Sequence, residues 1–265
     1  MTWRTLALLA VLLPANAASP QDTKSFSDRD DLARDSLQSG SQFLTPETRA
    51  TQSDDFANPG YLWVDRGETL FREGGETSCA ACHAAESDHP MKGVATRYPK
   101  FDARADTLLD LSGRINLCRA TFQAKPALAH ESEDLLSLSA YVASRSRGMP
   151  MAVEVTAESQ PWFDAGRDYF FRRRGQLNLA CNQCHDDNWG RQLRGDTISQ
   201  GHPNAWPGYR LEWQTLGSLH RRLQDCDAGV RAAPHEAGSD EYLGLELYLG
   251  WRARGLLMET PGIRR

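Results

Sequence analysis

Two short cysteine motifs contain the residue types of this chain that are best suited to chemistry. Both follow the pattern C-x-x-C-H, as Cys79-Ala-Ala-Cys82-His83 and Cys181-Asn-Gln-Cys184-His185. Two thiols one helical turn apart can form thioethers with the vinyl groups of haem, and the histidine that follows then lies under the iron as an axial ligand. A single copy could also be a redox-active pair, but two copies predict two covalently bound c-type haems.

Two further cysteines, Cys118 and Cys226, have no obvious thiol partner. Each has an arginine four positions before it, Arg114 or Arg222, and a proline eight positions after it. An arginine at this spacing lies one turn from the cysteine if the segment is helical.

The elements that must position these residues also occur twice. An amphipathic segment with aromatic side chains at helical spacing begins at Trp63 and again at Trp162, and each copy leads to one of the two motifs. A second helical stretch contains Cys118 or Cys226, and an apolar helix follows at residues 134–142 or 241–249. The chain is therefore a duplicated cytochrome c unit, and we expect an all-α fold of short helices around two haems.

The duplication provides a test for the second axial ligand, because equivalent positions should carry equivalent ligands. Histidine and methionine are the usual choices. After Met1 the methionines are Met91, Met149, Met151 and Met258, and the histidines outside the motifs are His89, His130, His202, His220 and His235. None of them has an aligned counterpart of its own kind in the other half. Cys118 and Cys226 do align, so we predict His83 and Cys118 at one iron and His185 and Cys226 at the other.

Other roles for these residues stay open at this point. In an oxidising compartment Cys118 and Cys226 could instead form a disulfide across the two halves. Two positions related by internal symmetry, however, more naturally repeat a role than join each other. His202 or Met258 could also be an axial ligand.

The N-terminal residues and the composition of the chain predict its cellular location. Met1-Thr-Trp-Arg4, an apolar run from Leu6 to Leu13 and the small-x-small pattern Ala15-Asn16-Ala17 predict a signal peptide over residues 1–17. No later segment approaches the roughly 18 apolar residues of a membrane helix. The formal net charge of −5 gives no indication of nucleic-acid binding. We therefore expect a periplasmic protein without a membrane span.

The rest of the chain divides into four further segments. Residues 18–58 are polar and predict a loosely ordered N-terminal arm, with a short helix around residues 30–39 and a possible role in holding a partner. Residues 59–149 form the first cytochrome c-like domain, residues 150–160 the linker, and residues 161–265 the second domain, which we expect to be catalytic.

Positive charge separates Cys226 from Cys118. Arg222 offers planar, permanently charged donors to the oxygens of a small anion, and Arg221, His220 and Arg231 add to a basic patch that the first half lacks. Nearby cations and iron would keep the Cys226 thiol deprotonated and reactive. Pairing with haem propionates or a solvated surface is the alternative role of these arginines.

Taken together, these residues resemble the SoxA subunit of the SoxAX cytochromes of sulfur oxidation, in the dihaem form. The resemblance covers the chain from about residue 60 onward and is most specific at Arg222-x-x-x-Cys226 followed by Val230-Arg-Ala-x-Pro234. It implies L-cysteine S-thiosulfotransferase activity, in which thiosulfate is joined oxidatively to a cysteine of the SoxY carrier in SoxYZ. Two electrons then leave through haem to a c-type cytochrome.

The same resemblance implies roles for single residues and a partner. Cys226 is expected to ligate the catalytic haem and to carry a persulfide, Arg222 to contact substrate, and Cys118 to ligate a first haem with no required catalytic part. A monohaem SoxX subunit is the expected partner in a heterodimer. The alternative function is a dihaem electron-transfer cytochrome without covalent sulfur chemistry. A dihaem peroxidase fits poorly because the matched cysteines would fill the open site that it needs, and a haem-bearing sensor or scaffold lacks an output domain.

Overall fold

The computed structural model of this chain describes residues 36–83 and 90–265. The predicted signal peptide, the first part of the N-terminal arm and His89 lie outside the described residues. None of the helices in the described part of the chain has the length and apolar character needed to cross a bilayer.

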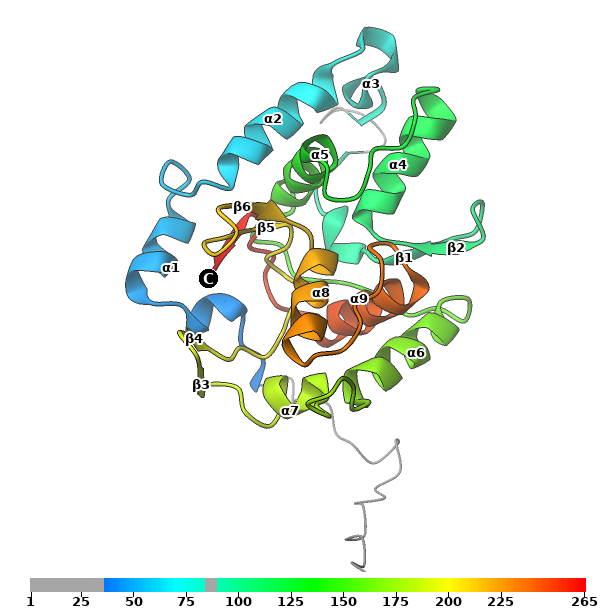
Figure 1. Cartoon of the computed structure of the whole chain (residues 1–265). Coiled ribbons are helices and arrows are strands. Elements are labelled where there is room, and N and C mark those ends of the chain that lie inside the picture. The colour runs from blue at the N-terminus through cyan, green and yellow to red at the C-terminus, as the bar shows by residue number, and fades with distance from the viewer. Residues whose placement is uncertain (1–35, 84–89) are drawn as a thin grey trace, which may run out of the picture. The chain divides into compact units, whose positions relative to one another are not determined.

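The described elements follow the order that the duplication predicts, as Figure 1 shows. The elements before and within the first half are η3 (Gly40–Phe43), α1 (Pro46–Ser53), α2 (Tyr61–Arg72), η4 (Gly75–Thr77), α3 (Cys79–His83), η5 (Ala95–Arg97), β1 (Lys100–Asp102), β2 (Thr107–Leu109), α4 (Leu111–Phe122) and α5 (Glu133–Ser144). The second half contains α6 (Gln160–Phe171), α7 (Cys181–His185), β3 (Gln192–Leu193), β4 (Asp196–Thr197), β5 (Gly208–Arg210), β6 (Thr215–Gly217), α8 (Leu219–Gly229), α9 (Asp240–Arg252) and β7 (Gly262–Arg264).

Each half is built on one pair of crossing helices. Helix α2 packs against α5, and α6 packs against α9. Glycine permits the close approach at both crossings: a Cβ on Gly67 would lie 2.0 Å from the carbonyl oxygen of Ser137, and one on Gly166 would lie 1.9 Å from that of Gly244. Backbones this close leave no room for a side chain, so the two glycines fix the same crossing in both halves.

The strands correct the all-α expectation. A short antiparallel hairpin precedes α4 (β1 with β2) and another precedes α8 (β5 with β6). Each strand has three residues, too few to display a period of two, and each turn holds a residue at positive φ, Asp106 at 50° or Gln214 at 53°. The C-terminal strand β7 joins β5 in parallel, a non-local pairing that a local pattern cannot reveal. Over residues 36–83 and 90–265 the fold is mainly helical, with three small sheets.

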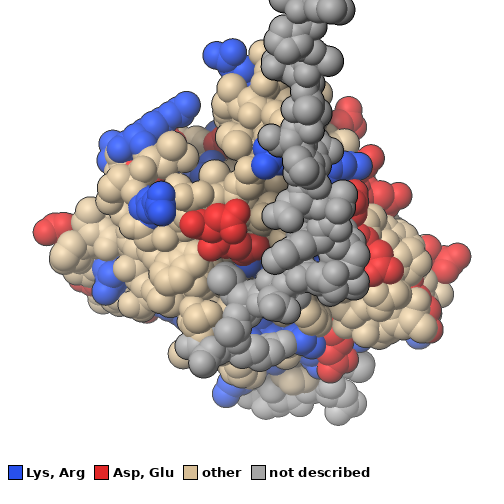
Figure 2. Space-filling model, turned by 90° about the horizontal axis from the view of Figure 1, so that it is seen from below, with Lys and Arg blue, Asp and Glu red and all other residues tan. Residues whose placement is uncertain are grey.

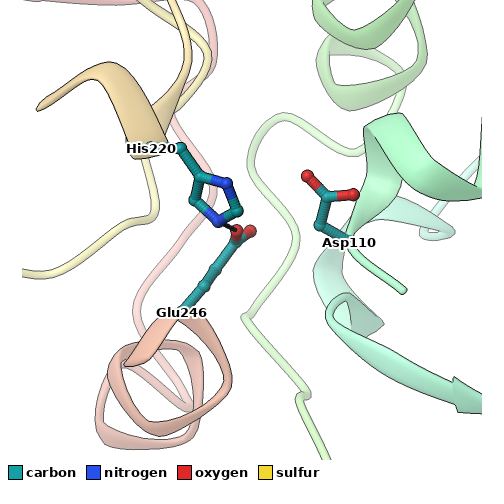
Figure 3. Close-up of side chains that lie close together, drawn as sticks. All are labelled: Asp110, His220 and Glu246. Atoms are coloured by element: carbon teal, nitrogen blue, oxygen red, sulfur yellow. Dashed lines mark ion pairs between the residues drawn. The ribbon is translucent and has the colours of Figure 1, made fainter. Parts of the chain in front are cut away.

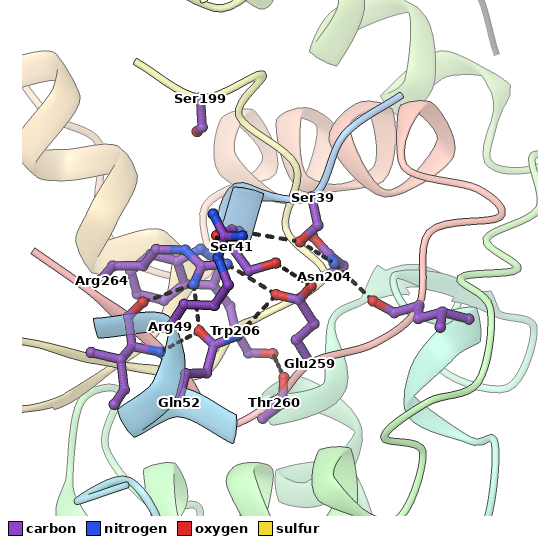
Figure 4. A network of polar contacts seen from close by, with 12 residues as sticks. Ser39, Ser41, Arg49, Gln52, Ser199, Asn204, Trp206, Glu259, Thr260 and Arg264 are labelled. Atoms are coloured by element: carbon purple, nitrogen blue, oxygen red, sulfur yellow. Dashed lines mark hydrogen bonds and ion pairs between the residues drawn. The ribbon is translucent and has the colours of Figure 1, made fainter. Parts of the chain in front are cut away.

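The described part of the N-terminal arm is folded, in contrast to the predicted loose arm. Most of the short helix predicted around residues 30–39 lies outside the described residues, and residues 37–39 are not helical. The regular helix of the described arm is α1, which contacts β7. The buried side chain of Gln52 accepts hydrogen bonds from the backbone N–H of Ile263 (2.9 Å) and from Arg264 (2.7 Å). Figure 4 shows Gln52 beside Arg264. This docking is polar, and for that reason the apolar pattern of the sequence did not predict it.

The predicted linker, residues 150–160, is non-helical up to Gln160, where α6 begins, but it is not an exposed tether. Met151 and Val153 are buried, and the backbone N–H of Met151 donates to Leu256 (2.8 Å). The backbone N–H of Met258 donates to the Met149 carbonyl (2.9 Å). The side chain of Met258 belongs to the same apolar cluster as Met151, which makes it a packing residue.

Charged side chains are mixed on the face shown in Figure 2, which looks at the molecule of Figure 1 from below. Lys and Arg are interspersed with Asp and Glu on the visible part of this face. This face therefore carries both signs of charge, in keeping with the small net negative charge of the chain.

Candidate active site

The second C-x-x-C-H motif forms the short helix α7, and the segment after it fixes the orientation of its histidine. His185 Nδ1 lies 2.7 Å from the carbonyl oxygen of Ser199, to which it donates. Gly201, at a φ of +73°, packs against the same ring, and a Cβ there would lie 2.9 Å from His185 Cγ. The imidazole is thus held from one side and keeps its Nε2 for another partner.

That partner is Cys226 on helix α8. The Cys226 thiol and the imidazole of His185 form a hydrogen bond, which must use Nε2 because Nδ1 is bonded to Ser199. Cys226 also lies close enough to Cys181 and Cys184 for their charges to interact. The structure therefore brings together all the residues that the sequence predicts at the second iron.

These residues fit a covalently attached haem of the c type. Two thiols stand one turn apart, and the histidine that follows them has one ring nitrogen fixed by a carbonyl group. A thiol faces the other ring nitrogen, and a glycine stands where a side chain would press on the ring. Cys181, Cys184, His185 and Cys226 are the residues that would hold the group.

The charge around Cys226 favours the thiolate. Burial raises the pKa of Cys226, but the charge of Arg222, the hydrogen bond with His185 and the charge of Arg210 lower it to about 7. By contrast, burial raises the pKa of Cys181 to about 12. Of these two thiols, Cys226 is therefore the one whose surroundings favour deprotonation.

Arg210 is a site residue that the sequence analysis missed. It lies on β5, its side chain is 5% exposed, and its Nε makes no hydrogen bond among the described residues. Burial and the neighbouring charge of Arg222 lower the pKa of Arg210, which shows that the two guanidinium groups lie close together. Its only described ion pair is with Glu212. Arg210 therefore adds a second positive charge beside Cys226.

The first half has the opposite charge at the same position. Arg114 makes an ion pair with Asp102 (2.6 Å), which stands 12 positions before it, as Arg210 stands before Arg222. Burial raises the pKa of Cys118, and Arg114 only partly opposes this effect. Comparison of the two hairpins, at the spacing that relates Cys118 to Cys226, would have revealed Arg210 from the sequence. In the first half an aspartate opposes the charge of Arg114, whereas in the second half Arg210, itself paired with Glu212, adds to the positive charge that acts on Cys226.

The first motif lies near its predicted cysteine. The charges of Cys79 and Cys82 both interact with Cys118, and the side chain of Gln123 lies 3.6 Å from the Cys79 sulfur. His83 ends helix α3 in the same motif. Because Cys118 lies with the first motif and Cys226 with the second, and all six cysteines are free thiols, no disulfide joins the two halves.

His220 corrects one prediction, because it is not part of the basic patch. Its buried side chain faces Glu246, with Nε2 2.9 Å from a carboxylate oxygen, and Asp110 of the first half lies opposite, as Figure 3 shows. His220 Nδ1 accepts from the backbone N–H of Gly238 (2.9 Å), so the proton of the neutral ring is on Nε2 and points at Glu246. The ring has no lone pair left for a metal ion, and the cluster is a hydrogen-bonded link between the halves.

Arg221 and Arg231, the other two residues of the predicted basic patch, also have other surroundings than predicted. The Arg221 guanidinium lies over the ring of Trp213 (4.1 Å), whereas Arg231 is exposed. The fixed charge at Cys226 therefore comes from Arg222 and Arg210.

A buried carboxylate anchors helix α8 directly after Cys226. Asp227 accepts hydrogen bonds from Tyr169 (2.6 Å) and Tyr242 (2.8 Å) and makes an ion pair with Arg174. The Arg174 guanidinium also lies 3.7 Å from the centroid of the Tyr169 ring. This network joins α6, α8 and α9, and it holds Cys226 in register with α7.

His202, one of the alternative ligands, is a buried neutral side chain. Its Nε2 lies 3.1 Å from Oε1 of Gln200, and burial, together with the charges of Arg252 and His185, lowers its pKa to about 3. Its contact with Gln200 and its low pKa give it a structural role.

Replacement of His202 by glutamine is expected to flatten the acid stability profile. Between the ordinary histidine pKa of 6.5 and the folded value of about 3, the unfolded chain binds one more proton at this residue, so stability falls as the pH falls. The slope is about 1.4 kcal/mol per pH unit. Denaturant unfolding between pH 6.5 and 4 should show a smaller slope in His202→Gln. The exposed His130→Gln serves as the control and should keep the wild-type slope.

Comparisons with known proteins point to one family by sequence and by structure. The family description "SoxA/TsdA, cytochrome c domain" matches residues 66–151, and such a domain implies covalent haem c. The chain is 39% identical over 233 residues to the L-cysteine S-thiosulfotransferase subunit SoxA of Pseudaminobacter salicylatoxidans. The match covers 86% of this chain and 80% of that protein. With the protein of the same name from Allochromatium vinosum it shares 32% identity, over 98% of this chain and 97% of that protein.

A solved structure is similar over the same range. The crystal structure of SoxXA from P. pantotrophus matches with a TM-score of 0.80 and 32% identity, and it covers 86% of this chain and 87% of that chain. The similarity thus extends over both halves of this chain and beyond the range of the cytochrome c domain description.

Proposed function

This chain belongs to the SoxA family, and on that basis we propose that it is the haem-bearing subunit of an L-cysteine S-thiosulfotransferase. The observation that carries the proposal is the position of Cys226, a thiol that faces His185 and lies beside two arginines with a pKa lowered to about 7. An electron-transfer protein needs axial ligands but has no need of a second, buried arginine at one of them.

We further propose that two haems are bound, one in each half. The thiols of Cys79, Cys82, Cys181 and Cys184 would attach them, and His83 with Cys118, and His185 with Cys226, would be the axial ligands. When bound, haem supplies an acceptor for the electrons that leave the sulfur atoms. The duplicated order of helices and hairpins in residues 59–149 and 161–265 supports an origin by duplication of one cytochrome c unit.

The residues of this chain would bind the substrate and activate the sulfur. Thiosulfate is a dianion, and Arg222 and Arg210 offer it two permanent positive charges next to Cys226. The same charges keep Cys226 as a thiolate, which can hold a sulfane sulfur. Overall, thiosulfate and a carrier thiol would form one S–S bond, release one proton from the thiol and give up two electrons.

The proposed reaction requires a protein that supplies the thiol and a protein that takes up the two electrons. The carrier thiol would be a cysteine of SoxY in SoxYZ, and the electrons would pass to a c-type cytochrome. The similar solved structure is that of SoxXA, which supports a monohaem SoxX subunit as the partner of this chain. The N-terminal sequence with its predicted signal peptide supports a periplasmic location.

Substitution of Arg222 by alanine tests the substrate site. Loss of a hydrogen-bonded charge of this kind costs about 1.5–3 kcal/mol, which corresponds to a loss of roughly 10- to 150-fold in kcat/KM for thiosulfate. Haem content, read from the absorption spectrum, should stay at the wild-type level because Arg222 holds no covalent bond to the group.

Arg114→Ala is the matched control, since Asp102 already neutralises this arginine. It should leave kcat/KM within a factor of about two, an effect in the range of ordinary surface substitutions. Equal activities of Arg222→Ala and the wild type would contradict the substrate role. Intact-protein mass spectrometry adds an independent test, because a sulfur adduct on Cys226 is expected for the transferase and not for a pure electron carrier.

A further inference from the structure

The carbonyl group that orients His185 is part of a segment held by two buried amide side chains. Ser199 provides this carbonyl, and Gln200 and Asn204, both 0% exposed, follow it in the sequence. Gly201, with its positive φ, stands between them. A glycine at this position adds backbone freedom, so local conformation alone holds the Ser199 carbonyl only weakly.

The N-terminal part of the described chain supplies the bonds that hold this segment. Gln200 Oε1 accepts from the backbone N–H of Gln38 (2.8 Å), and Gln200 Nε2 donates to the carbonyl of Ser36 (2.9 Å). At the other end of the segment, Asn204 Nδ2 donates to the hydroxyl of Ser39 (3.0 Å). Residues 36–39, here called the N-terminal clasp, therefore contact both ends of the segment that carries the His185 partner.

The clasp is itself anchored at a distance from the site. Ser41 donates to Glu259 (2.8 Å), a contact that Figure 4 shows, and Gln52 on α1 accepts from the backbone N–H of Ile263 in β7 (2.9 Å). Glu259 and Ile263 lie in the C-terminal segment, whose strand β7 pairs with β5, the strand that contains Arg210. The clasp thus has a fixed position of its own and can impose that position on residues 199–204.

We propose that the N-terminal clasp positions the imidazole of His185 and that Gln200 is a positioning residue of the second haem site. Gln200 acts through the neighbouring Ser199 carbonyl, whose hydrogen bond with Nδ1 sets the plane of the ring and the donor strength of its other nitrogen. This inference rests on the proposed function in so far as it takes His185 as an axial ligand. It gives residues 36–39 of the predicted arm a role within their own chain, which is to fix the orientation of an iron ligand.

Replacement of Gln200 by leucine in the full-length holoprotein tests the proposal. Leucine has a similar size but cannot bond the clasp, so the Ser199 carbonyl loses its fixed position and the bond to Nδ1 weakens. A weaker bond makes the imidazole a poorer donor to ferric iron, and we expect the reduction potential of this haem to become more positive. The ferric EPR g-values of the same haem should change, while those of the haem at residues 79–83 serve as an internal reference.

A second variant acts from the clasp and leaves the interior intact. Gln38→Pro removes the backbone N–H that donates a hydrogen bond to Gln200 Oε1. It should shift the reduction potential of the second haem in the same direction as Gln200→Leu. The exposed amide of Gln192 on β3 is the control, and Gln192→Leu should leave both potentials unchanged.

Two results would overturn the inference. One is a Gln200→Leu protein that loses stability but keeps the wild-type potential and g-values, since that would show a packing role only. The other is a Gln38→Pro protein with unchanged signals. Neither of these measurements depends on catalytic activity. The proposed function has a separate test, since it fails if the Cys226→Ala protein remains active.

Discussion

The Cys226→Ala protein is expected to lose thiosulfate conjugation by a factor on the order of 10³ or more, because it lacks the thiol that faces His185 and whose pKa Arg222 and Arg210 lower. Haem attachment should survive, since the four motif cysteines are intact. The measurement is the rate at which a carrier thiol gains thiosulfate, followed by mass spectrometry, with haem content from the absorption spectrum.

Cys118→Ala is the matched control for this experiment. Cys118 holds the equivalent position in the first half, but its pKa is raised by burial and Asp102 neutralises its arginine. Its replacement should change the spectrum of the first haem and leave most of the conjugation activity. If the two alanine variants lost activity to the same extent, the difference in charge between the halves would not explain catalysis.

The Gly166→Ala protein is expected to lose about 3 kcal/mol of unfolding free energy, at the upper end of the usual cost of overpacking. The new Cβ would lie 1.9 Å from the carbonyl oxygen of Gly244, so α6 and α9 would have to move apart. These helices carry Tyr169 and Tyr242, which hold Asp227 beside Cys226, and for that reason activity should fall as well. Urea unfolding of the holoprotein measures the first effect.

Gly229→Ala provides the comparison within the same half. No atom lies within 4 Å of a Cβ at Gly229, the last residue of α8, so alanine should be neutral or should stabilise the helix by up to about 1 kcal/mol. Equal stability of Gly166→Ala and the wild type would mean that the helix crossing tolerates a side chain, contrary to the close contact of the backbones.

The chemistry of this protein is local in the sequence, and the sequence therefore determined much of it. The two C-x-x-C-H motifs need only one helical turn each, and Arg222 and Cys226 need only one more. The paired helices followed from the aromatic and apolar periodicities, and α2, α5, α6 and α9 lie where those patterns predict them. The repeat then matched Cys118 to Cys226 without any structure.

What only the tertiary structure decided depends on contacts between distant segments. The repeat relates Arg210 to Asp102 in the sequence, but only the fold shows that the charge of Arg210 on β5 acts on Cys226 of α8. His220 turns away from the patch because Glu246 of α9 offers it a buried carboxylate. The clasp docks through single hydrogen bonds to Gln200 and Asn204, for which the sequence contains no period. Local spacing specifies which groups can react, whereas the charge and orientation of those groups come from residues that meet only when the chain is folded.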